Sequence, residues 1–571
     1  MAYANAPLIV QSDKTILLEA AHPAYDEARD SLLGFAELEK SPEHMHTYRI
    51  TPLSLWNAAA SGISADSIIS SLESLSRYPL PGNVVRDIRE CVARYGKLRL
   101  EKNRGQLVLT CEERALALEV WSYPQVQELL EQRLTDLEFS LSPHNRGRIK
   151  QVLTRLGYPV KDLAGYRAGD SLGISMRQDT ASGEKFRLRR YQQSAVDAFW
   201  AHGSVHGGSG IIVLPCGAGK TIIGIGAMSK LKCETLILAT NVVAVRQWID
   251  EILDKCDIHR DMVGEYTGEV KQVCPVTVTT YQILTHRKRK HEEFPHFNIF
   301  SRKNWGLIIY DEVHLLPAPV FRVTADLQAT RRLGLTATLV REDGCEEDVF
   351  SLIGPKRFDM PWKDLERQGW IASAVCREIR TSLDEDLKLE YAVADAKSKF
   401  RIASENPRKT EILKKLLSVH REDQVLIIGQ YLEQLEAIAA EICCPLICGK
   451  TPNTERQRLY AEFKSGTVKT LVVSKVANFA IDLPDAGVLI QVSGTFGSRQ
   501  EEAQRLGRIL RPKKNGKPAV FYSIVTQETK DQDFAQKRQL FLTEQGYYYQ
   551  IGCVDEILDA DTGLPERSST P

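Results

Sequence analysis

The chain of 571 residues is predicted to be an α/β protein in which small mixed α/β domains precede two tandem lobes, each built on a parallel sheet. Three observations predict this fold class. The length exceeds what one hydrophobic core supports, so several domains are expected. Beyond residue 186, short apolar runs of strand length alternate with helical segments, which is typical of parallel sheets covered by helices. This alternation occurs twice, and each series predicts one lobe.

The part of the chain before the lobes divides into two predicted domains. Residues 1–100 alternate short apolar runs with helical patterns such as 64–75, so a small mixed α/β domain is expected there. Residues 101–185 contain a strand-like run at 106–111 and a helix-like pattern at 126–139. They end in the polar segment RQDTASGEK, which is typical of a linker.

Two series of strand candidates define the lobes. The first lobe is expected at 186–367, with strands in the runs GIIVLPC, TLILAT, VTVTTYQ, GLIIYDE and RLGLTAT. The second lobe is expected at 368–545, with strands in QVLIIGQ, PLICG, TLVVSK, GVLIQVS and AVFYSIV. Helix-like stretches such as YLEQLEAIAAEI separate the strands. Residues 546–571 are expected to form a polar carboxy-terminal tail.

Charge and cysteine content narrow the classes of function. Lys and Arg total 74, and Asp and Glu also total 74, so a nucleic-acid partner would have to bind a local basic stripe. The 12 cysteines show no C-x-x-C spacing, which argues against zinc sites. Neither a basic leader nor a run of membrane-spanning length occurs. We therefore expect a reducing, cytoplasmic compartment and no membrane contact.

The run 210–221 has the order of an apolar strand, a glycine-containing turn and a helix start. Such a turn lets successive N–H groups and the helix N-terminus face a phosphate, while a lysine reaches the β and γ oxygens and a hydroxyl faces Mg²⁺. The residues expected in these roles are Gly217, Ala218, Gly219, Lys220 and Thr221. Leu214 stands where the strict pattern has glycine, so this motif alone also fits a helix start with a surface lysine.

A second motif, WGLIIYDEVH at 305–314, predicts a buried strand that ends in two adjacent carboxylates. Asp311 at the end of the strand can hold Mg²⁺, largely through water, and Glu312 can orient and polarise an attacking water. The alternative interpretation is an aspartate that caps a following helix. Together with Lys220, the pair favours hydrolysis of a nucleoside triphosphate.

In the second lobe, Gln504, Arg508 and Arg511 are spaced four and three residues apart, so they share one face of a helix. Arginines on such a face can sense a γ-phosphate and stabilise the charge that develops on it during hydrolysis. A solvated basic helix face is the alternative.

The order of these motifs resembles that of the superfamily 2 helicases. The resemblance is carried by Arg189-Arg-Tyr191-Gln192, LPCGAGKT (Walker A), the DEVH box, Thr336-Ala337-Thr338 and QRLGR. More narrowly, LGLTATLVRED and SKVANFAIDLPDAGVLIQVSG are similar to the XPB-type DNA repair helicases. The opening phrases LIVQSDKTILLE and HTYRITPLSLWNA are similar to the amino-terminal domain of the bacterial form.

The resemblance implies two RecA-like lobes and an ATP-dependent 3′–5′ DNA helicase or translocase that opens duplex DNA in a process like nucleotide excision repair. It implies ATP and Mg²⁺ as cofactors. It also assigns roles by motif position: adenine binding to Arg189 and Gln192, coupling of the lobes to Thr336, Thr338 and Asp482, and duplex opening to Arg341, Glu342 and Asp343.

Contacts with the backbone of one DNA strand are expected at motif positions in both lobes. The candidates are Arg246, Thr280, Tyr281, Ser474 and Lys475. The family's thumb-like insertion would lie at about 384–404, where this chain is short. Residues 101–185 occupy the place of a damage-recognition domain.

The resemblance further implies a monomeric, nucleoid-associated motor acting on forked or bubble DNA, with a nuclease as an expected partner. Two alternatives remain open. One is a nucleotide-gated DNA clamp or scaffold, in which hydrolysis only resets a switch. The other is an RNA helicase of the same superfamily.

Overall fold

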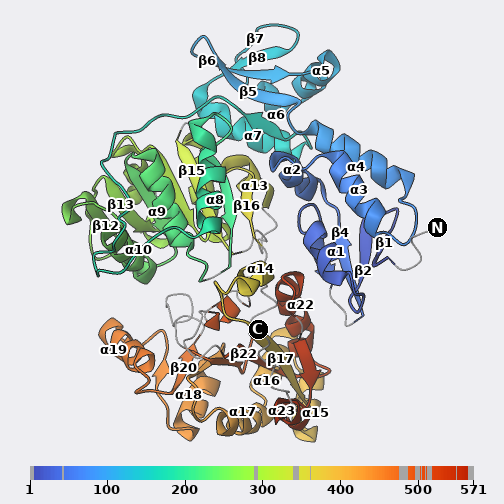
Figure 1. Cartoon of the computed structure of the whole chain (residues 1–571), viewed down its shortest axis with the longest axis vertical. Helices are drawn as coiled ribbons and strands as arrows, with labels where there is room; N and C mark the ends of the chain where they lie inside the picture. The colour runs from blue at the N-terminus through green and yellow to red at the C-terminus, as the bar shows by residue number, and fades with distance from the viewer. Residues whose placement is uncertain are drawn as a thin grey trace. The chain divides into compact units, whose positions relative to one another are not determined.

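The computed structural model describes the chain except for residues 1–5, 41–43, 216, 288–293, 329, 338–345, 361, 475–485, 495–501, 503–504, 508, 511–516, 548 and 563–571. It contains two compact units (Figure 1). The first consists of residues 1–214 and 219–360, and the second consists of 361–571 together with 215–218. Two seven-stranded parallel sheets, one in each unit, confirm the predicted α/β class with tandem lobes.

The amino-terminal domain is an antiparallel sheet covered by helices. Its strands are β1 (Leu8–Val10), β2 (Thr15–Glu19), β3 (Glu37–Lys40) and β4 (Met45–Arg49), in the order β1-β2-β4-β3. The helices are α1 (Tyr25–Leu32), α2 (Pro52–Ala60), α3 (Ala65–Leu75) and α4 (Gly82–Arg94). Thr51 and Ser54 cap the start of α2 reciprocally, which fixes where this helix begins. The predicted helix at 64–75 is α3.

The next domain has a five-stranded sheet in the order β7-β8-β6-β5-β9. Its strands are β5 (Leu98–Asn103), β6 (Gln106–Cys111), β7 (Gln132–Arg133), β8 (Glu138–Leu141) and β9 (Val160–Asp162). Its helices are α5 (Arg114–Ser122), α6 (Pro124–Gln127) and α7 (Arg146–Arg155), with a 3₁₀ turn, η1 (Pro143–Asn145), before α7. The strand predicted at 106–111 is β6.

The prediction of a helix at 126–139 is wrong. Helix α6 ends at Gln127, and β7 and β8 occupy the rest of that segment. Strand β8 pairs antiparallel with β6, and it buries Phe139 and Leu141 in the domain core. Leu134, which contributed to the helical pattern, is exposed. Pairing with a distant strand outweighs a local helical periodicity, because burial against the partner strand decides the stability of a strand.

The first lobe carries a parallel sheet in the order β12-β13-β11-β14-β15-β10-β16. Its strands are β10 (Ser209–Val213), β11 (Thr235–Ala239), β12 (Val263–Tyr266), β13 (Val276–Thr280), β14 (Leu307–Asp311), β15 (Arg331–Thr336) and β16 (Lys356–Asp359). Its described helices are α8 (Arg190–Trp200), α9 (Lys220–Leu231), α10 (Val242–Lys255), α11 (Tyr281–Leu284), α12 (Ala318–Asp326) and α13 (Glu346–Leu352), with short 3₁₀ turns between them. Figure 1 labels α8, α9, α10 and α13.

The five strands predicted for this lobe match β10, β11, β13, β14 and β15. Strands β10, β11 and β13 are buried along their whole length, which explains their continuous apolar runs. Neighbouring strands β14, β15 and β10 bring their carboxyl ends to one edge of the sheet. The motifs after β10, β14 and β15 therefore meet at that edge.

The second lobe repeats the architecture in the order β19-β20-β18-β21-β22-β17-β23. Its strands are β17 (Ala374–Thr381), β18 (Val425–Gly429), β19 (Leu446–Ile447), β20 (Thr470–Ser474), β21 (Val488–Gln491), β22 (Ala519–Thr526) and β23 (Tyr549–Gly552). Its described helices include α14 (Trp362–Arg367), α15 (Glu385–Val393), α16 (Ala396–Ser404), α17 (Arg408–Val419), α18 (Leu432–Glu441), α19 (Asn453–Lys464), α22 (Lys530–Glu544) and α23 (Val554–Thr562).

The second lobe extends into the residues expected to be a tail. Strand β23 pairs parallel with β17 at the edge of the sheet, and α23 follows it. The sequence did not predict this strand because β23 is short and largely exposed, so it has no strong apolar pattern of its own. Its pairing with β17 places it in the sheet. Residues 384–404, where the resemblance places a thumb-like insertion, form a pair of helices, α15 and α16, and α15 contains no buried residue.

Helix α7 docks the second domain onto the first lobe. Gly147 lies so close to α12 that a Cβ atom on it would be 2.3 Å from the Ala325 carbonyl oxygen. Farther along α7, Gln151 and Arg155 both bond to Asp348 at 2.9 Å. The amino-terminal domain also contacts this lobe, since Asn57 accepts a hydrogen bond from the backbone N–H of Lys356. None of the described helices is both long and apolar enough to cross a membrane.

Candidate nucleotide-binding site

The turn between β10 and α9 has the geometry of a phosphate-binding loop. Gly217 and Gly219 have φ angles of 81° and 80°, a left-handed conformation that glycine adopts without strain. Helix α9 begins at Lys220 directly after Gly219, and no described side chain caps its start. The N–H groups of its first turn, which include that of Thr221, and the positive end of the helix dipole therefore suit an anion.

Gln192 packs against this turn from α8. Its side-chain oxygen accepts a hydrogen bond from the Arg189 backbone N–H at 3.0 Å, which caps α8. A Cβ atom on Gly219 would lie 2.5 Å from the Gln192 side-chain nitrogen, so glycine is needed there for space as well as for conformation. The guanidinium of Arg189 donates to the Tyr191 hydroxyl at 3.2 Å. The motif predicted to bind adenine therefore lies directly beside the phosphate loop.

Lys220 points toward the acidic pair at the end of β14. Its ammonium lies 3.3 Å from Glu312 Oε1 and 3.4 Å from the carbonyl oxygen of Leu214. Leu214, which replaces the usual glycine, is fully buried, and its N–H donates to the Thr336 carbonyl at 2.9 Å. Leucine is accommodated here because it fills the core under the loop.

Glu312 has a backbone conformation that places its carboxylate beyond the strand. Its φ and ψ angles are 48° and 57°, a left-handed conformation that costs a non-glycine residue about 1–3 kcal/mol. Its Oε2 atom is buried, lies 3.4 Å from His314 Nδ1, and has no hydrogen-bond partner among the described residues. A buried carboxylate oxygen without a partner is a suitable acceptor for a water molecule.

The two carboxylates differ in pKa. Burial, reinforced by the negative charge of Glu312, raises the pKa of Asp311. Burial acts in the same direction on Glu312, but the positive charge of Lys220 and the neighbouring His314 outweigh it and lower the pKa of Glu312. Divergent pKa values in one buried pair are typical of a functional site. Glu312 is thereby kept ionised at neutral pH.

His314 connects β14 with β15. Its ring is almost completely buried, and Nδ1 lies 2.8 Å from the Thr336 hydroxyl. Thr336, which is predicted to couple the lobes, is therefore connected to Glu312 through His314.

Mg²⁺ fits the oxygen donors at this edge. Thr221 follows Lys220 in the first turn of α9, and Asp311 ends β14 with its carboxylate largely buried. A hydroxyl and a carboxylate are ligands that Mg²⁺ accepts while it keeps several waters. A cation beside Asp311 would stabilise its ionised form, which burial and the charge of Glu312 disfavour.

Several predicted site residues lie outside the described residues. They are Gln504, Arg508, Arg511, Arg341, Glu342, Asp343, Thr338, Lys475 and Asp482. Their roles stay predictions.

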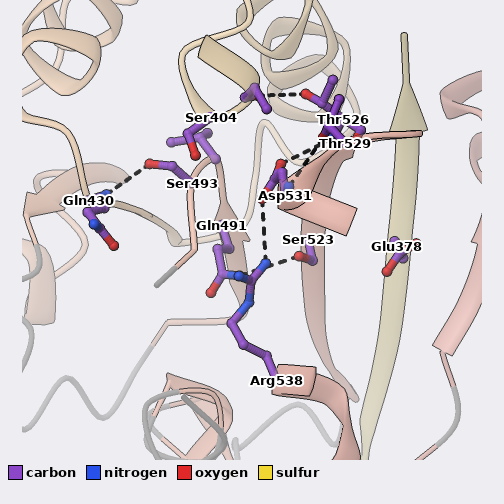
Figure 2. A network of polar contacts seen from close by, with 12 residues as sticks. Glu378, Ser404, Gln430, Gln491, Ser493, Ser523, Thr526, Thr529, Asp531 and Arg538 are labelled. Atoms are coloured by element: carbon purple, nitrogen blue, oxygen red, sulfur yellow. Dashed lines mark hydrogen bonds and ion pairs between the residues drawn. The ribbon is translucent and has the colours of Figure 1, made fainter. Parts of the chain in front are cut away.

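The structure describes several residues next to the arginine motif of the second lobe, and they are buried. Arg505, which follows Gln504, is fully buried and bonds to Gln491 at the end of β21. Glu502, one turn earlier, lies 3.7 Å from Arg538 of α22. Figure 2 shows Gln491, Ser523, Asp531 and Arg538 gathered beside the sheet. Buried polar contacts thus anchor this segment to the second lobe.

The described DNA-contact candidates are mostly engaged within the first lobe. The Arg246 guanidinium approaches Glu269 at 2.8 Å and Glu265 at 3.5 Å. The Thr280 side chain caps α11, and the Tyr281 side chain is buried, with its hydroxyl donating to the Asp311 carbonyl at 3.0 Å. Contacts of Thr280 or Tyr281 with DNA would therefore use the backbone. In the second lobe, Ser474 ends β20 with its hydroxyl buried.

The structure adds Trp248, which the sequence did not indicate. It lies on α10 with 1% of its surface exposed, and its indole N–H donates to Asp311 Oδ2 at 2.9 Å. A tryptophan on the apolar face of an amphipathic helix is normally a core residue, so nothing in its spacing distinguished it.

Comparisons with known proteins agree with this geometry. The family model "ERCC3/RAD25/XPB C-terminal helicase" matches residues 365–565, "Type III restriction enzyme, res subunit" matches 185–341, and "Helicase conserved C-terminal domain" matches 8–135. The "DNA 3'-5' helicase XPB" of Mycobacterium tuberculosis is 52% identical over 97% of this chain and 99% of its own length.

Two further relatives extend the comparison. The protein of the same name from Kineococcus radiotolerans is 51% identical over 98% of both chains. The "General transcription and DNA repair factor IIH helicase/translocase subunit XPB" of Enterocytozoon bieneusi is 34% identical over 96% of this chain and 92% of its own length.

Proposed function

Because the chain belongs to the XPB-type family of DNA helicases, we propose that it hydrolyses ATP to move 3′ to 5′ along DNA and to open duplexes during DNA repair. The observation that carries this proposal is the convergence of Lys220, Asp311 and Glu312 at one edge of the first sheet. A binding module would not need, beside the phosphate lysine, a buried carboxylate whose Oε2 accepts no hydrogen bond from the described residues.

The residues of this edge divide the work of hydrolysis. The first turn of α9 and Lys220 hold the β- and γ-phosphates, and Gln192 with Arg189 holds the adenine next to the loop. Thr221 and, through water, Asp311 would hold Mg²⁺, which would neutralise charge on the phosphate oxygens. Glu312, ionised and pointing beyond the strand, orients the attacking water. His314, which lies beside Glu312 and contacts the Thr336 hydroxyl, links Glu312 to the end of β15.

The remaining assignments follow the family pattern and belong to the same proposal. Gln504, Arg508 and Arg511 sense the γ-phosphate, and Thr338 and Asp482 take part in coupling. Arg341, Glu342 and Asp343 act in duplex opening, and Arg246, Thr280, Tyr281, Ser474 and Lys475 contact DNA. Forked or bubble DNA is the substrate, a nuclease is the partner, and the motor is monomeric and acts on the nucleoid.

The site is tested by single substitutions in the first lobe. Lys220→Ala and Glu312→Gln should each lower DNA-stimulated ATP hydrolysis at least about 100-fold, the first by losing phosphate contacts and the second after ATP has bound. Lys230→Ala is the control, since Lys230 lies on the same helix with its side chain 47% exposed. Normal turnover in either site variant would contradict the assignment.

The activity is tested on tailed duplexes. Unwinding should require a 3′ tail and ATP, and single-stranded DNA should stimulate hydrolysis more than RNA does. Stronger stimulation by RNA would favour an RNA helicase instead. ATP-dependent retention on DNA without displacement of either a strand or a triplex-forming oligonucleotide would favour the clamp.

A further inference from the structure

The Asp311 carboxylate is held by an aromatic side chain from a separate helix. Trp248 on α10 donates its indole N–H to Asp311 Oδ2 at 2.9 Å. A hydrogen bond to one oxygen of a carboxylate fixes the rotation of the group and so determines where the other oxygen points. The backbone N–H of Glu312 also donates to this carboxylate, so Trp248 is one of two donors that together set its orientation.

The indole ring is itself held in place by α9. A Cβ atom on Gly224 would lie 2.5 Å from Trp248 Cη2 and 3.1 Å from Cζ3, so the ring lies directly on the helix backbone. The same Cβ would be 3.4 Å from Ile309 Cδ1 of β14. The ring is therefore enclosed between the helix that begins at the phosphate loop and the strand that ends at Asp311, and it has little freedom to move.

The main chain of Asp311 is held separately. The Tyr281 hydroxyl donates to the Asp311 carbonyl oxygen at 3.0 Å, and the Tyr281 side chain is 5% exposed. With the backbone fixed from α11, rotation of the side chain is the freedom that remains to Asp311. Trp248 restricts that rotation.

We propose that Trp248 is a positioning residue that orients the Asp311 carboxylate toward hydrated Mg²⁺. The inference rests on the proposed function, which assigns Asp311 to the metal. Trp248 does not touch the nucleotide or the reacting atoms. It acts through Asp311, so its loss should weaken the response to Mg²⁺ and leave the phosphate loop intact.

The test is the affinity of the full-length protein for a fluorescent ADP, titrated with Mg²⁺ and repeated in EDTA. Trp248→Phe keeps an aromatic ring in the core but removes the N–H. The Mg²⁺ concentration needed for half of the metal-dependent gain in affinity should rise about 10-fold, as expected for a lost hydrogen bond to a charged group. Affinity in EDTA should stay within about two-fold of the wild type, because the phosphate loop is unchanged.

Two further variants make the result specific. Trp200→Phe is the matched control, because the Trp200 indole nitrogen is buried without a hydrogen-bond partner among the described residues, and it should leave the Mg²⁺ titration unchanged. Gly224→Ala keeps the indole N–H but pushes the ring away from α9, and it should reproduce the effect of Trp248→Phe. It provides the test should Trp248→Phe fail to fold.

Asp311→Asn separates the two proposals. If it abolishes the effect of Mg²⁺ while Trp248→Phe and Gly224→Ala both titrate like the wild type, the positioning role is wrong and the metal site stands. If Asp311→Asn itself titrates like the wild type, the assignment of Asp311 to Mg²⁺ fails, and the inference about Trp248 fails with it.

Discussion

At the scale of single residues, burial sets the charge state of groups far from the nucleotide as well as near it. His46 of β4 is 2% exposed, and its Nδ1 lies 3.0 Å from the Tyr25 hydroxyl. Burial, with a smaller contribution from the positive charge of Arg29, lowers the pKa of His46 to about 4. The folded amino-terminal domain therefore keeps this ring neutral at pH values where the unfolded chain protonates it.

This pKa predicts a loss of stability on acidification. The unfolded chain binds the proton near pH 6.5 and the folded chain near pH 4, so folding becomes less favourable as the pH falls through that range, by about 2 kcal/mol at pH 5. In His46→Gln, which does not titrate, the fall in Tm between pH 7 and pH 5 should be smaller than in the wild type. His144→Gln, at an exposed position, is the control. Equal falls in all three proteins would exclude this role for His46.

At the scale of elements, α7 joins the second domain to the first lobe through close packing and buried charge. Lys150 is fully buried, bonds to Gln328 of the lobe, and lies 3.0 Å from Asp162, which also pairs with Arg146 at 2.8 Å. Desolvation, only partly offset by Asp162, lowers the pKa of Lys150 to about 7. Such a satisfied polar network fixes one arrangement of the domain on the lobe, because any shift would leave charges unpaired.

Enlarging α7 at its contact with α12 should loosen this joint. In Gly147→Ala the new methyl group meets the Ala325 backbone, which cannot move aside as a side chain would, so we expect a loss of about 1–3 kcal/mol. Thermal unfolding measures this loss of stability, and the rate of limited proteolysis at sites within 95–185 shows whether the second domain is loosened. Gly173→Ala is the control, because an added Cβ there meets nothing within 4 Å. Unchanged protease resistance in Gly147→Ala would show that α7 does not hold the domain.

At the scale of the whole molecule, the two compact units have separate cores and separate polar networks. The second lobe contains a buried pair, Lys409 and Asp531, with the ammonium 2.7 Å from the carboxylate and both side chains at most 1% exposed. Arg538 lies 3.8 Å from the same carboxylate (Figure 2). Units with their own cores are expected to unfold as separate cooperative steps.

Breaking the pair between Lys409 and Asp531 should therefore lower the stability of the second unit only. Lys409→Met leaves Asp531 without its nearest cation and should destabilise the second lobe by about 3–5 kcal/mol, while the unfolding step that MgADP stabilises stays unchanged. Scanning calorimetry with and without MgADP distinguishes the steps. Lys414→Met, on the same helix as Lys409, breaks an exposed pair with Glu441 of α18 and should cost less than about 1 kcal/mol. A single transition that shifts as a whole would refute separate unfolding.

Much of the fold and of the candidate nucleotide site could be predicted from the sequence, because their determinants are local. The parallel strands are continuous apolar runs, and Lys220, Asp311 and Glu312 stand directly after strands in short contiguous motifs. Local order is enough to place such residues at the carboxyl edge of a parallel sheet. The same reasoning failed at 126–139, where a distant strand decided the conformation.

The sequence by itself determined the two lobes, the glycine-containing turn between β10 and α9, and the acidic pair at the end of β14. Only the tertiary structure decided which residues support them. Trp248 reaches Asp311 across 63 residues, Gly147 of α7 meets Ala325 of α12 across nearly 180, and β23 extends a sheet that begins far earlier in the chain. Contacts of this kind depend on how the surfaces of distant segments fit and bury each other. That fit leaves no periodic pattern in the sequence of either segment.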